Sequence, residues 1–259
     1  MFKFLQKLHV RWILLLVKKD GLKERIYKID DSEIPPPKLR FKVNGSTDLE
    51  SYLAVATELK NDIDKELFKF DKSLNTFESI LDFGCGCGRI TQKLLSGSKT
   101  NFFGCDLDGD AILWCQKNIP EVKFIINSST PPLPYENNSF DFIFAVSVFT
   151  HLNKEYQISW LQELNRILKP GGFLFMTING EYSIKMINPT TNIKNIFKKK
   201  GFVFVHDPVT NELFPEFYGA CYMSKYYVTQ YFSKYFEVID YVVKGNGHIQ
   251  DIVMLRKSN

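Results

Sequence analysis

The chain has 259 residues, 44% of them hydrophobic and 24% charged, so it can form a large buried core and is not disordered. Its net charge is +4, and residues 1–25 alone carry a surplus of five positive charges. The remainder is close to neutral, which argues against a broad nucleic-acid-binding face.

The N-terminal segment 1–21 alternates apolar and basic residues. Its apolar run is interrupted by Arg11, whereas a membrane-spanning helix needs about 20 apolar residues and a signal peptide needs an unbroken core. We therefore expect a cytoplasmic protein. Four basic residues share one helical face: Lys3, Lys7, Arg11 and Lys18. We interpret this face as solvated, and a weak peripheral membrane contact is the alternative.

The five cysteines are odd in number and lie in a long chain, so they do not form a disulfide framework. Cys85 and Cys87 are separated by one residue, which is not the spacing of about two to four residues found in zinc sites. We therefore expect reduced thiols and no bound metal.

The proline triplet at 35–37 ends any preceding helix, and Thr47-Asp48-Leu49-Glu50 has the form of a capping box. Apolar residues then recur at helical spacing and predict a helix over 48–60: Leu49, Leu53, Ala56 and Leu59. We expect residues 1–75 to form a helical extension and cap on an α/β domain over 76–259.

From residue 79, short apolar runs alternate with helical segments. Strands are predicted over 79–83, 101–105, 122–126, 140–146 and 173–178. Helices are predicted over 89–95, 109–118 and 154–168, and the last of these stops at a K-P-G-G turn. This alternation predicts parallel βαβ units with right-handed crossovers. An irregular, aromatic-rich region follows at 181–222, and then a helix at 225–233 and strands at 236–243 and 251–256.

A glycine-rich turn follows the first predicted strand and reads D-F-G-C-G-C-G from Asp82 to Gly88. Glycines let a cofactor approach the backbone closely, and the helix-start N–H groups then face the ligand. The spacing is G-x-G-x-G, not the G-x-G-x-x-G of dinucleotide sites. Asp82 would attract an ammonium group and repel a pyrophosphate, which favours S-adenosylmethionine over a nicotinamide cofactor.

A second acid, Asp106, ends the second predicted strand and comes 24 residues after Asp82. This position suits a carboxylate that accepts hydrogen bonds from both ribose hydroxyls. It fits either class of nucleotide cofactor, so it supports the fold more than the reaction.

The approach to the fourth strand reads L-P-Y-E-N-N-S-F-D from Leu133 to Asp141. Together with the turn after Asp82, the acid Asp106 and the K-P-G-G turn at 169–172, it resembles class I S-adenosylmethionine-dependent methyltransferases, especially small bacterial ones of the type-11/12 group. The resemblance implies a Rossmann-like sheet of seven strands, the last antiparallel, with helices on both faces and an insertion after the fifth strand. It also implies S-adenosylmethionine as cofactor.

Carried over by position, the resemblance implies a cofactor site made of Asp82, Gly84, Cys85, Gly86, Asp106, Leu107, Asn127, Ser128 and Ser147. Asp82 and the glycines would line the methionine end, and Leu107 would pack on the adenine. The family usually has an acid where this chain has Asn127, whose side-chain carbonyl can still accept the adenine amino hydrogen. Ser147 would lie beneath the sulfonium.

His151 follows the fourth strand near the expected mouth of the pocket. It is our candidate catalytic residue, a general base for the methyl acceptor. The alternative is a structural role at the start of the next helix. Methyl transfer does not always need a base, because the sulfonium is an activated leaving group and in-line positioning can suffice.

We expect a small-molecule or glycan-like acceptor, bound between residues 40–52 and the 181–222 insertion. The insertion supplies many aromatic residues: Phe197, Phe202, Phe204, Phe214, Phe217, Tyr218 and Tyr222. A nucleic acid is not the expected partner, because base-amino enzymes carry N/D-P-P-Y/F where this chain reads S-V-F-T from Ser147. Two alternatives stay open: a nicotinamide-dependent oxidoreductase and a non-catalytic cofactor-binding protein.

Overall fold

The computed structural model describes residues 13–22, 34–95, 99–206, 215 and 217–259. Of the predicted basic face, Lys3, Lys7 and Arg11 lie outside these ranges, and Lys18 is exposed on a helix over 13–22. Within the described ranges, no helix combines the length and the apolar character needed to cross a membrane.

Two helices precede the sheet. α2 (Pro37–Asn44) begins at the proline triplet and ends at Gly45. α3 (Leu49–Phe68) continues beyond the predicted end at residue 60, because Ile63 and Leu67 extend its buried stripe. Its N-cap is Asp48, whose carboxylate accepts a hydrogen bond from the Ser51 N–H at 2.6 Å, so the predicted capping box is displaced by one residue. Leu53, which was assigned to the stripe, is 51% exposed.

The core is a seven-stranded sheet in the order β3-β2-β1-β4-β5-β9-β8. Its strands are β1 (Ser79–Phe83), β2 (Asn101–Asp106), β3 (Lys123–Ile126), β4 (Phe140–Ala145), β5 (Leu168–Ile178), β8 (Glu237–Asn246) and β9 (Gln250–Arg256). β1 to β5 pair in parallel, and β9 runs antiparallel to both β5 and β8. The expected mixed sheet with an antiparallel last strand is confirmed.

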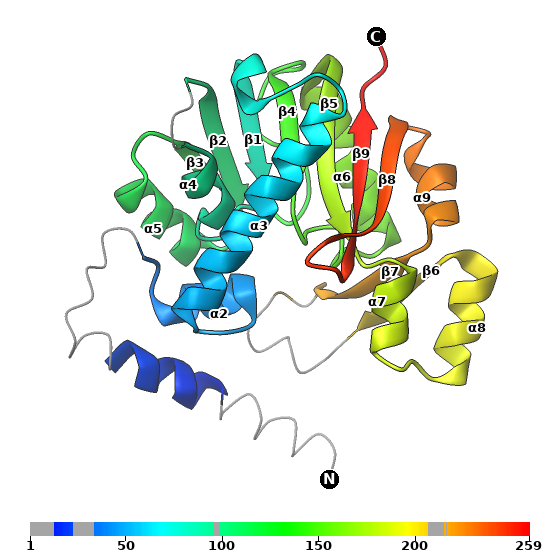
Figure 1. The fold of residues 1–259 in the computed structure, drawn as a ribbon, viewed down its shortest axis with the longest axis horizontal. Helices are drawn as coiled ribbons and strands as arrows, with labels where there is room; N and C mark the ends of the chain where they lie inside the picture. Colours follow the sequence, from blue (N-terminus) through cyan, green and yellow to red (C-terminus); the bar gives the residue numbers. More distant parts are fainter. Residues whose placement is uncertain (1–12, 23–33, 96–98, 207–214, 216) are drawn as a thin grey trace.

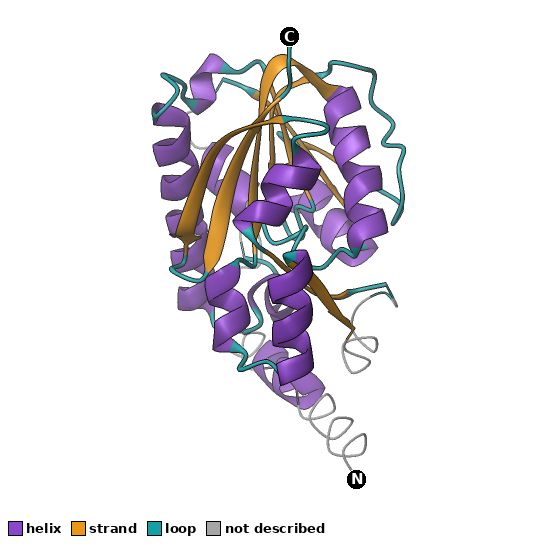
Figure 2. Ribbon diagram, turned by 90° about the vertical axis from the view of Figure 1, so that its right-hand side faces the viewer, coloured by secondary structure: helices purple, strands orange, loops and turns teal. Residues whose placement is uncertain are grey.

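Helices cover both faces of this sheet (Figure 1, Figure 2). They are α4 (Arg89–Leu95), α5 (Gly109–Asn118), α6 (Lys154–Ile167) and α9 (Lys225–Phe232), together with α3. Successive strand residues point to opposite faces, so Phe144 packs with α3, α4 and α5 while Ala145 packs with α6 and α9. Because Ile63 of α3 lies in the same apolar cluster as Phe144, α3 shares the core of the sheet.

The insertion after β5 is more regular than the sequence indicated. It contains α7 (Glu181–Met186), α8 (Thr191–Lys200), β6 (Phe202–His206) and β7 (Gly219–Met223). β6 and β7 form a two-stranded antiparallel sheet. Ile184, Val203 and Tyr222 bury a small separate core between these strands and the two helices. The expectation of an irregular region is therefore wrong.

The carboxyl ends of the parallel strands meet at one edge of the sheet. α7 leaves this edge directly after β5, and α2 reaches it from the other side, where Val43 lies against the glycine turn after β1. Both helices project from the same end of the molecule (Figure 1). In open α/β sheets this is the edge at which ligands bind.

Candidate functional site

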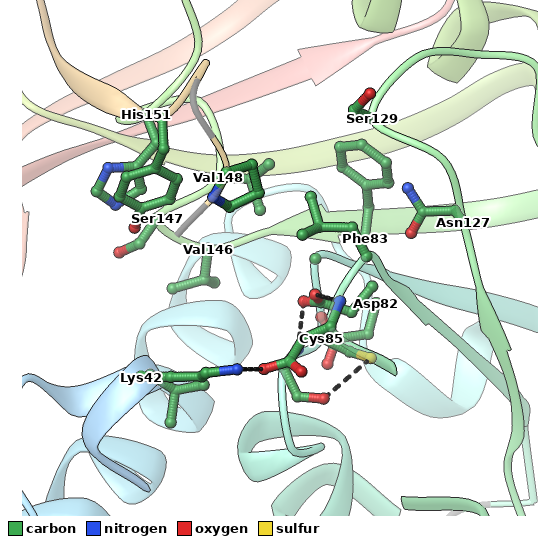
Figure 3. Close-up of a pocket in the computed structure, with 18 of the residues that line it drawn as sticks. Lys42, Asp82, Phe83, Cys85, Asn127, Ser129, Val146, Ser147, Val148 and His151 are labelled. Carbon is green, nitrogen blue, oxygen red and sulfur yellow. Dashed lines mark hydrogen bonds and ion pairs between the residues drawn. The ribbon is translucent and has the colours of Figure 1, made fainter. Parts of the chain in front are cut away.

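A cavity of about 780 Å³ lies at this carboxyl edge (Figure 3). It is lined by every residue predicted from the sequence: Asp82, Gly84, Cys85, Gly86, Asp106, Leu107, Asn127, Ser128, Ser147 and His151. The structure therefore brings together the residues that follow β1, β2, β3 and β4, as expected for strand ends at one edge of a parallel sheet.

The glycine turn is required by close packing on both sides. Gly84 (φ 77°) and Gly86 (φ 53°) adopt left-handed backbone conformations that favour glycine. A Cβ at Gly84 would lie 2.3 Å from Val148, and one at Gly86 would lie 2.4 Å from Val43. The Cys85 thiol is buried in the core beneath the turn, so this residue faces the cavity with its backbone.

Asp106 ties the end of β2 to the glycine turn. One carboxylate oxygen accepts a hydrogen bond from the Gly86 N–H at 2.8 Å, and the other accepts one from the Asp108 N–H at 2.8 Å. A carboxylate offers about four acceptor positions, so both oxygens can also accept hydrogen bonds from a ligand. Burial raises the pKa of this acid, although the two N–H donors oppose the effect.

Asp82 is 2% exposed and accepts a hydrogen bond from the Thr91 hydroxyl at 2.6 Å. Burial raises its pKa to about 7; the Thr91 bond opposes this rise, and the nearby Asp106 adds to it. A cationic group in the cavity would stabilise the ionised carboxylate and lower this pKa. The ammonium of S-adenosylmethionine is a group of this kind.

Asn127, after β3, provides a direct test of whether a nucleotide fits. Its side-chain oxygen is buried and accepts no hydrogen bond from any residue that the structure describes, while its amide donates to the Ser128 carbonyl at 2.7 Å. An unsatisfied buried acceptor costs about 1–3 kcal/mol. An adenine amino group would satisfy it, and the apolar side chain of Leu107, 41% exposed, borders the same cavity. The residues present therefore fit the adenosine of the cofactor.

α2 closes the cofactor side of the cavity, a feature that the sequence did not indicate. Lys42 pairs with Asp108 at 2.6 Å, and Lys38 pairs with Asp110 at 2.8 Å, so α2 is fastened to the start of α5. The first pair is largely buried and the second is exposed. The Lys-x-x-x-Lys spacing, which places both cations on one helical face, is the only sequence signal for this contact.

The expected acceptor wall at residues 40–52 is only partly realised. Lys42 and Val43 line the cavity. Arg40 is 1% exposed and donates hydrogen bonds to the backbone carbonyls of Pro35 and Thr47. Tyr52 is buried against the Cys87 thiol, with its oxygen 3.4 Å from the sulfur. The last two side chains therefore stabilise the loop and helix behind the wall.

His151 lines the cavity after β4 (Figure 3). Its Nδ1 lies 2.8 Å from the Gly219 carbonyl oxygen. Since a carbonyl only accepts, Nδ1 carries the proton and Nε2 keeps its lone pair in the neutral ring. Burial lowers the pKa of His151 to about 4, so the ring is neutral at physiological pH. The geometry gives His151 a structural role in holding β7 and leaves Nε2 available as a base.

The insertion completes the wall around His151 with a few residues. Pro215, Phe217 and Tyr218 line the cavity, and Phe217 stacks on Tyr156 with ring centroids 4.8 Å apart. The other predicted aromatic residues with described positions pack elsewhere: Phe197, Phe204, Tyr222 and Phe202. Phe214 lies outside the described residues. Most of the aromatic residues of the insertion are therefore core residues.

Ser147 ends β4 with a left-handed backbone (φ 57°). Its N–H donates to the Thr177 hydroxyl at 2.8 Å, and its own hydroxyl donates to the Gln250 side chain at 3.1 Å. These bonds join β4, β5 and β9 at the floor of the cavity.

Acids at two adjacent strand ends, a glycine turn and an unsatisfied acceptor after the third strand define a nucleotide-cofactor-binding α/β protein. Among the described residues, no group of His, Cys, Asp or Glu side chains is arranged to hold a metal ion.

Comparison with known proteins identifies the family. Residues 80–172 match the family described as methyltransferase domain. The chain is 34% identical over 111 residues to tRNA (carboxymethyluridine(34)-5-O)-methyltransferase of Arabidopsis thaliana, covering 42% of this chain and 26% of that protein. It is 32% identical over 107 residues to phthiotriol/phenolphthiotriol dimycocerosates methyltransferase 1 of Mycobacterium ulcerans, covering 38% and 36%. The chain thus spans well under two thirds of these relatives.

The fold extends beyond the matched segment. The structure of an S-adenosylmethionine-dependent methyltransferase from Methanosarcina mazei superposes with a TM-score of 0.57 at 21% identity, covering 74% of this chain and 97% of that one. The chain is a class I S-adenosylmethionine-dependent methyltransferase, as the motifs indicated, and S-adenosylmethionine is its cofactor.

Proposed function

We propose that the enzyme methylates a small, uncharged acceptor, either a small molecule or a glycan-like one. The observation that carries this proposal is the division of the cavity into a charged and an uncharged side. The wall around His151 consists of uncharged side chains: Val148, Pro215, Phe217 and Tyr218. The charged residues lie on the cofactor side, after β1 and β2 and on α2 and α4.

The size of the cavity supports the same conclusion. Small-molecule pockets typically enclose about 300–1,000 Å³, and this cavity of about 780 Å³ has to hold the cofactor as well as the reacting part of the acceptor. Both lining cations are already bound: Lys42 pairs with Asp108, and Arg89 donates to Asn44 and to the Val43 carbonyl. Neither is left to hold a phosphate.

The names of the relatives do not agree on an acceptor. One relative is named for a tRNA nucleoside and another for dimycocerosates. The features that decide between acceptor classes therefore have to come from this chain, and its uncharged wall favours the small acceptor over tRNA.

We assign the chemical roles within this proposal as follows. The bound cofactor supplies a methyl group on a positively charged sulfur. Asp82 would hold its ammonium, Asp106 its ribose and Asn127 its adenine amino group. Neutral His151 would accept the proton of an acceptor hydroxyl at Nε2, since Nδ1 is held by Gly219. The ring of Tyr218 fixes the orientation of that base.

We also propose the division at residue 75, with α2 of the N-terminal part capping the cofactor side. We place the enzyme in the cytoplasm, because all five cysteines are free and buried and would stay reduced there.

The experiment is a labelling assay with two acceptor pools. Purified protein is incubated with S-adenosylmethionine labelled in its methyl group, once with a small-molecule and glycan extract and once with total tRNA. We expect label in the first pool only, and none with a His151→Phe variant that still binds S-adenosylhomocysteine. Label confined to tRNA would overturn the small acceptor. Calorimetry that shows binding of NAD and no binding of S-adenosylhomocysteine would overturn the cofactor roles.

A further inference from the structure

The insertion collects the positive charge of the second half of the chain. Residues 181–200 contain five lysines and one acidic residue, a surplus of four that equals the net charge of the whole chain. All five are exposed, and none forms a salt bridge with a described residue: Lys185, Lys194, Lys198, Lys199 and Lys200. This charge is not neutralised within the described molecule.

The charges do not serve the local fold alone. The apolar face of α8, with Ile193 and Phe197, packs on the small core of the insertion, so its lysines face outward. The three lysines at the end of α8 complement the helix dipole. Lys194 gains nothing from that dipole, because it lies near the helix N-terminus, where a cation is disfavoured.

Exposed apolar side chains lie beside these lysines. Met186 is 61% exposed, Ile187 is 49% exposed, and Ile249 in the turn between β8 and β9 is 51% exposed. The Ser183 hydroxyl donates to the Ile249 carbonyl at 2.6 Å, which places this turn against α7. Met186 and Ile187 follow Ser183 by one helical turn, so the three apolar side chains lie on neighbouring turns.

We propose that this basic and apolar surface, formed by the lysines of residues 185–200 with Met186, Ile187 and Ile249, binds the surface of an anionic membrane. Exposed large apolar side chains ringed by lysines are typical of segments that insert into the headgroup region of a bilayer. Each lysine near an anionic leaflet contributes about 1 kcal/mol of attraction. A polynucleotide would engage the lysines without using the apolar residues.

The position of the surface is compatible with access to the cavity. α7 and α8 lie side by side and project from the end of the molecule that carries the carboxyl edge of the sheet (Figure 1, Figure 2). A membrane bound there would lie on the same side as the cavity. The inference does not depend on the identity of the acceptor, and membrane binding is measured without methyl transfer.

The test is co-sedimentation of the full chain with vesicles of phosphatidylcholine alone or mixed with phosphatidylglycerol. We expect pelleting with the anionic vesicles only, and loss of pelleting at high salt. The charge-reversed variant is Lys194→Glu/Lys198→Glu/Lys199→Glu. It should bind at least about tenfold more weakly, since three favourable charges become repulsive.

A matched control reverses three exposed lysines elsewhere, on α4, on α5 and after α3: Lys93→Glu, Lys117→Glu and Lys72→Glu. This control has the same net charge as the test variant and should bind vesicles within about twofold of the native chain. Equal losses in both variants would mean that only net charge matters, and would overturn the proposed surface. Unchanged calorimetric affinity for S-adenosylhomocysteine shows that both variants are folded.

Three further measurements decide against other occupants. Met186→Ser/Ile187→Ser should weaken binding about tenfold with the charge intact, and an unchanged affinity would contradict insertion into the bilayer. Deletion of residues 1–20 should leave most of the binding, and its complete loss would assign the contact to the N-terminal helix. Filter binding of total tRNA that depends on Lys194, Lys198 and Lys199, without vesicle binding, would identify the surface as an RNA site.

Discussion

The rings of His151 and Tyr218 stack nearly parallel, with centroids 4.0 Å apart and planes 16° from each other. One residue follows β4 of the central sheet and the other belongs to the insertion, so two separate parts of the chain meet at the cavity. The backbone reinforces this contact, because the Cys221 N–H donates to the Thr150 carbonyl at 2.7 Å. The insertion therefore fixes the one side chain that can act as a base.

We expect Tyr218→Ala to lower kcat/KM about 2- to 10-fold, the range that corresponds to an aromatic pair worth about 0.5–1.5 kcal/mol. Affinity for S-adenosylhomocysteine should stay unchanged, because the cofactor residues lie on the other side of the cavity. Tyr218→Phe keeps the stack and should retain activity. Steady-state kinetics and calorimetry provide the two readings. Equal losses in both variants would mean that the hydroxyl, not the stack, matters.

The affinity for S-adenosylhomocysteine should rise between pH 6 and pH 8. Burial raises the pKa of Asp82 to about 7, and a ligand ammonium binds the ionised carboxylate better than the neutral acid. Ligand binding should therefore release a proton near neutral pH. Calorimetry in two buffers of different ionisation enthalpy measures this proton directly. Asp82→Asn should abolish the pH dependence, and a wild-type affinity that is flat over this range would contradict the contact.

Asp106→Ala should weaken cofactor binding by about 1.5–3 kcal/mol, the scale of hydrogen bonds to a charged group. The loss has two sources, because Asp106 would hold the ribose and also accepts the Gly86 N–H that shapes the glycine turn. Asp110→Ala removes a neighbouring, exposed acid and serves as the control. A smaller effect for Asp106 than for Asp110 in titration calorimetry would place the ribose elsewhere.

The stability of the folded protein should depend on His151 in acid. The pKa is about 4 in the folded state, below the ordinary value of about 6.5, so the unfolded chain binds the extra proton more readily. The contribution is complete above pH 6.5 and is lost as the pH falls towards 4. It amounts to about 2–3 kcal/mol. Urea unfolding from pH 7 to pH 4 should therefore fall less steeply in His151→Phe.

The exposed His248 offers a control for this series. His248→Phe should follow the wild-type pH dependence, because its side chain is not buried. If His151→Phe also follows the wild-type curve, the acid sensitivity arises from other groups.

The sequence allowed the strand ends of the site to be predicted because they obey a local rule. An acid or a glycine turn after a buried strand marks the carboxyl edge wherever the chain folds as βαβ units. Asp82, Asp106 and Asn127 are of this kind. Lys42 and Tyr218 were not predicted as contacts of the cavity, since both reach it through tertiary packing of α2 and of the insertion.

The same distinction applies to the fold. Helices such as Arg89–Leu95 and Gly109–Asn118 follow glycine or acidic residues that mark their start, and their predicted bounds are confirmed. The insertion was misjudged because its apolar residues serve two cores. Tyr222 packs in the small one and Met223 in the large one, so neighbouring positions give no single period. Such a division is visible only in three dimensions.

The position of β9 has a consequence for how the protein assembles. It lies between β5 and β8, although its residues come after those of every other strand. Until Gln250–Arg256 have paired, β5 presents an open edge whose neighbouring positions, once filled by Val253 and Leu255, are completely buried. An unpaired strand edge of this kind invites association with other chains. A chain shortened before residue 250 should therefore aggregate during folding even with its cofactor-binding half intact.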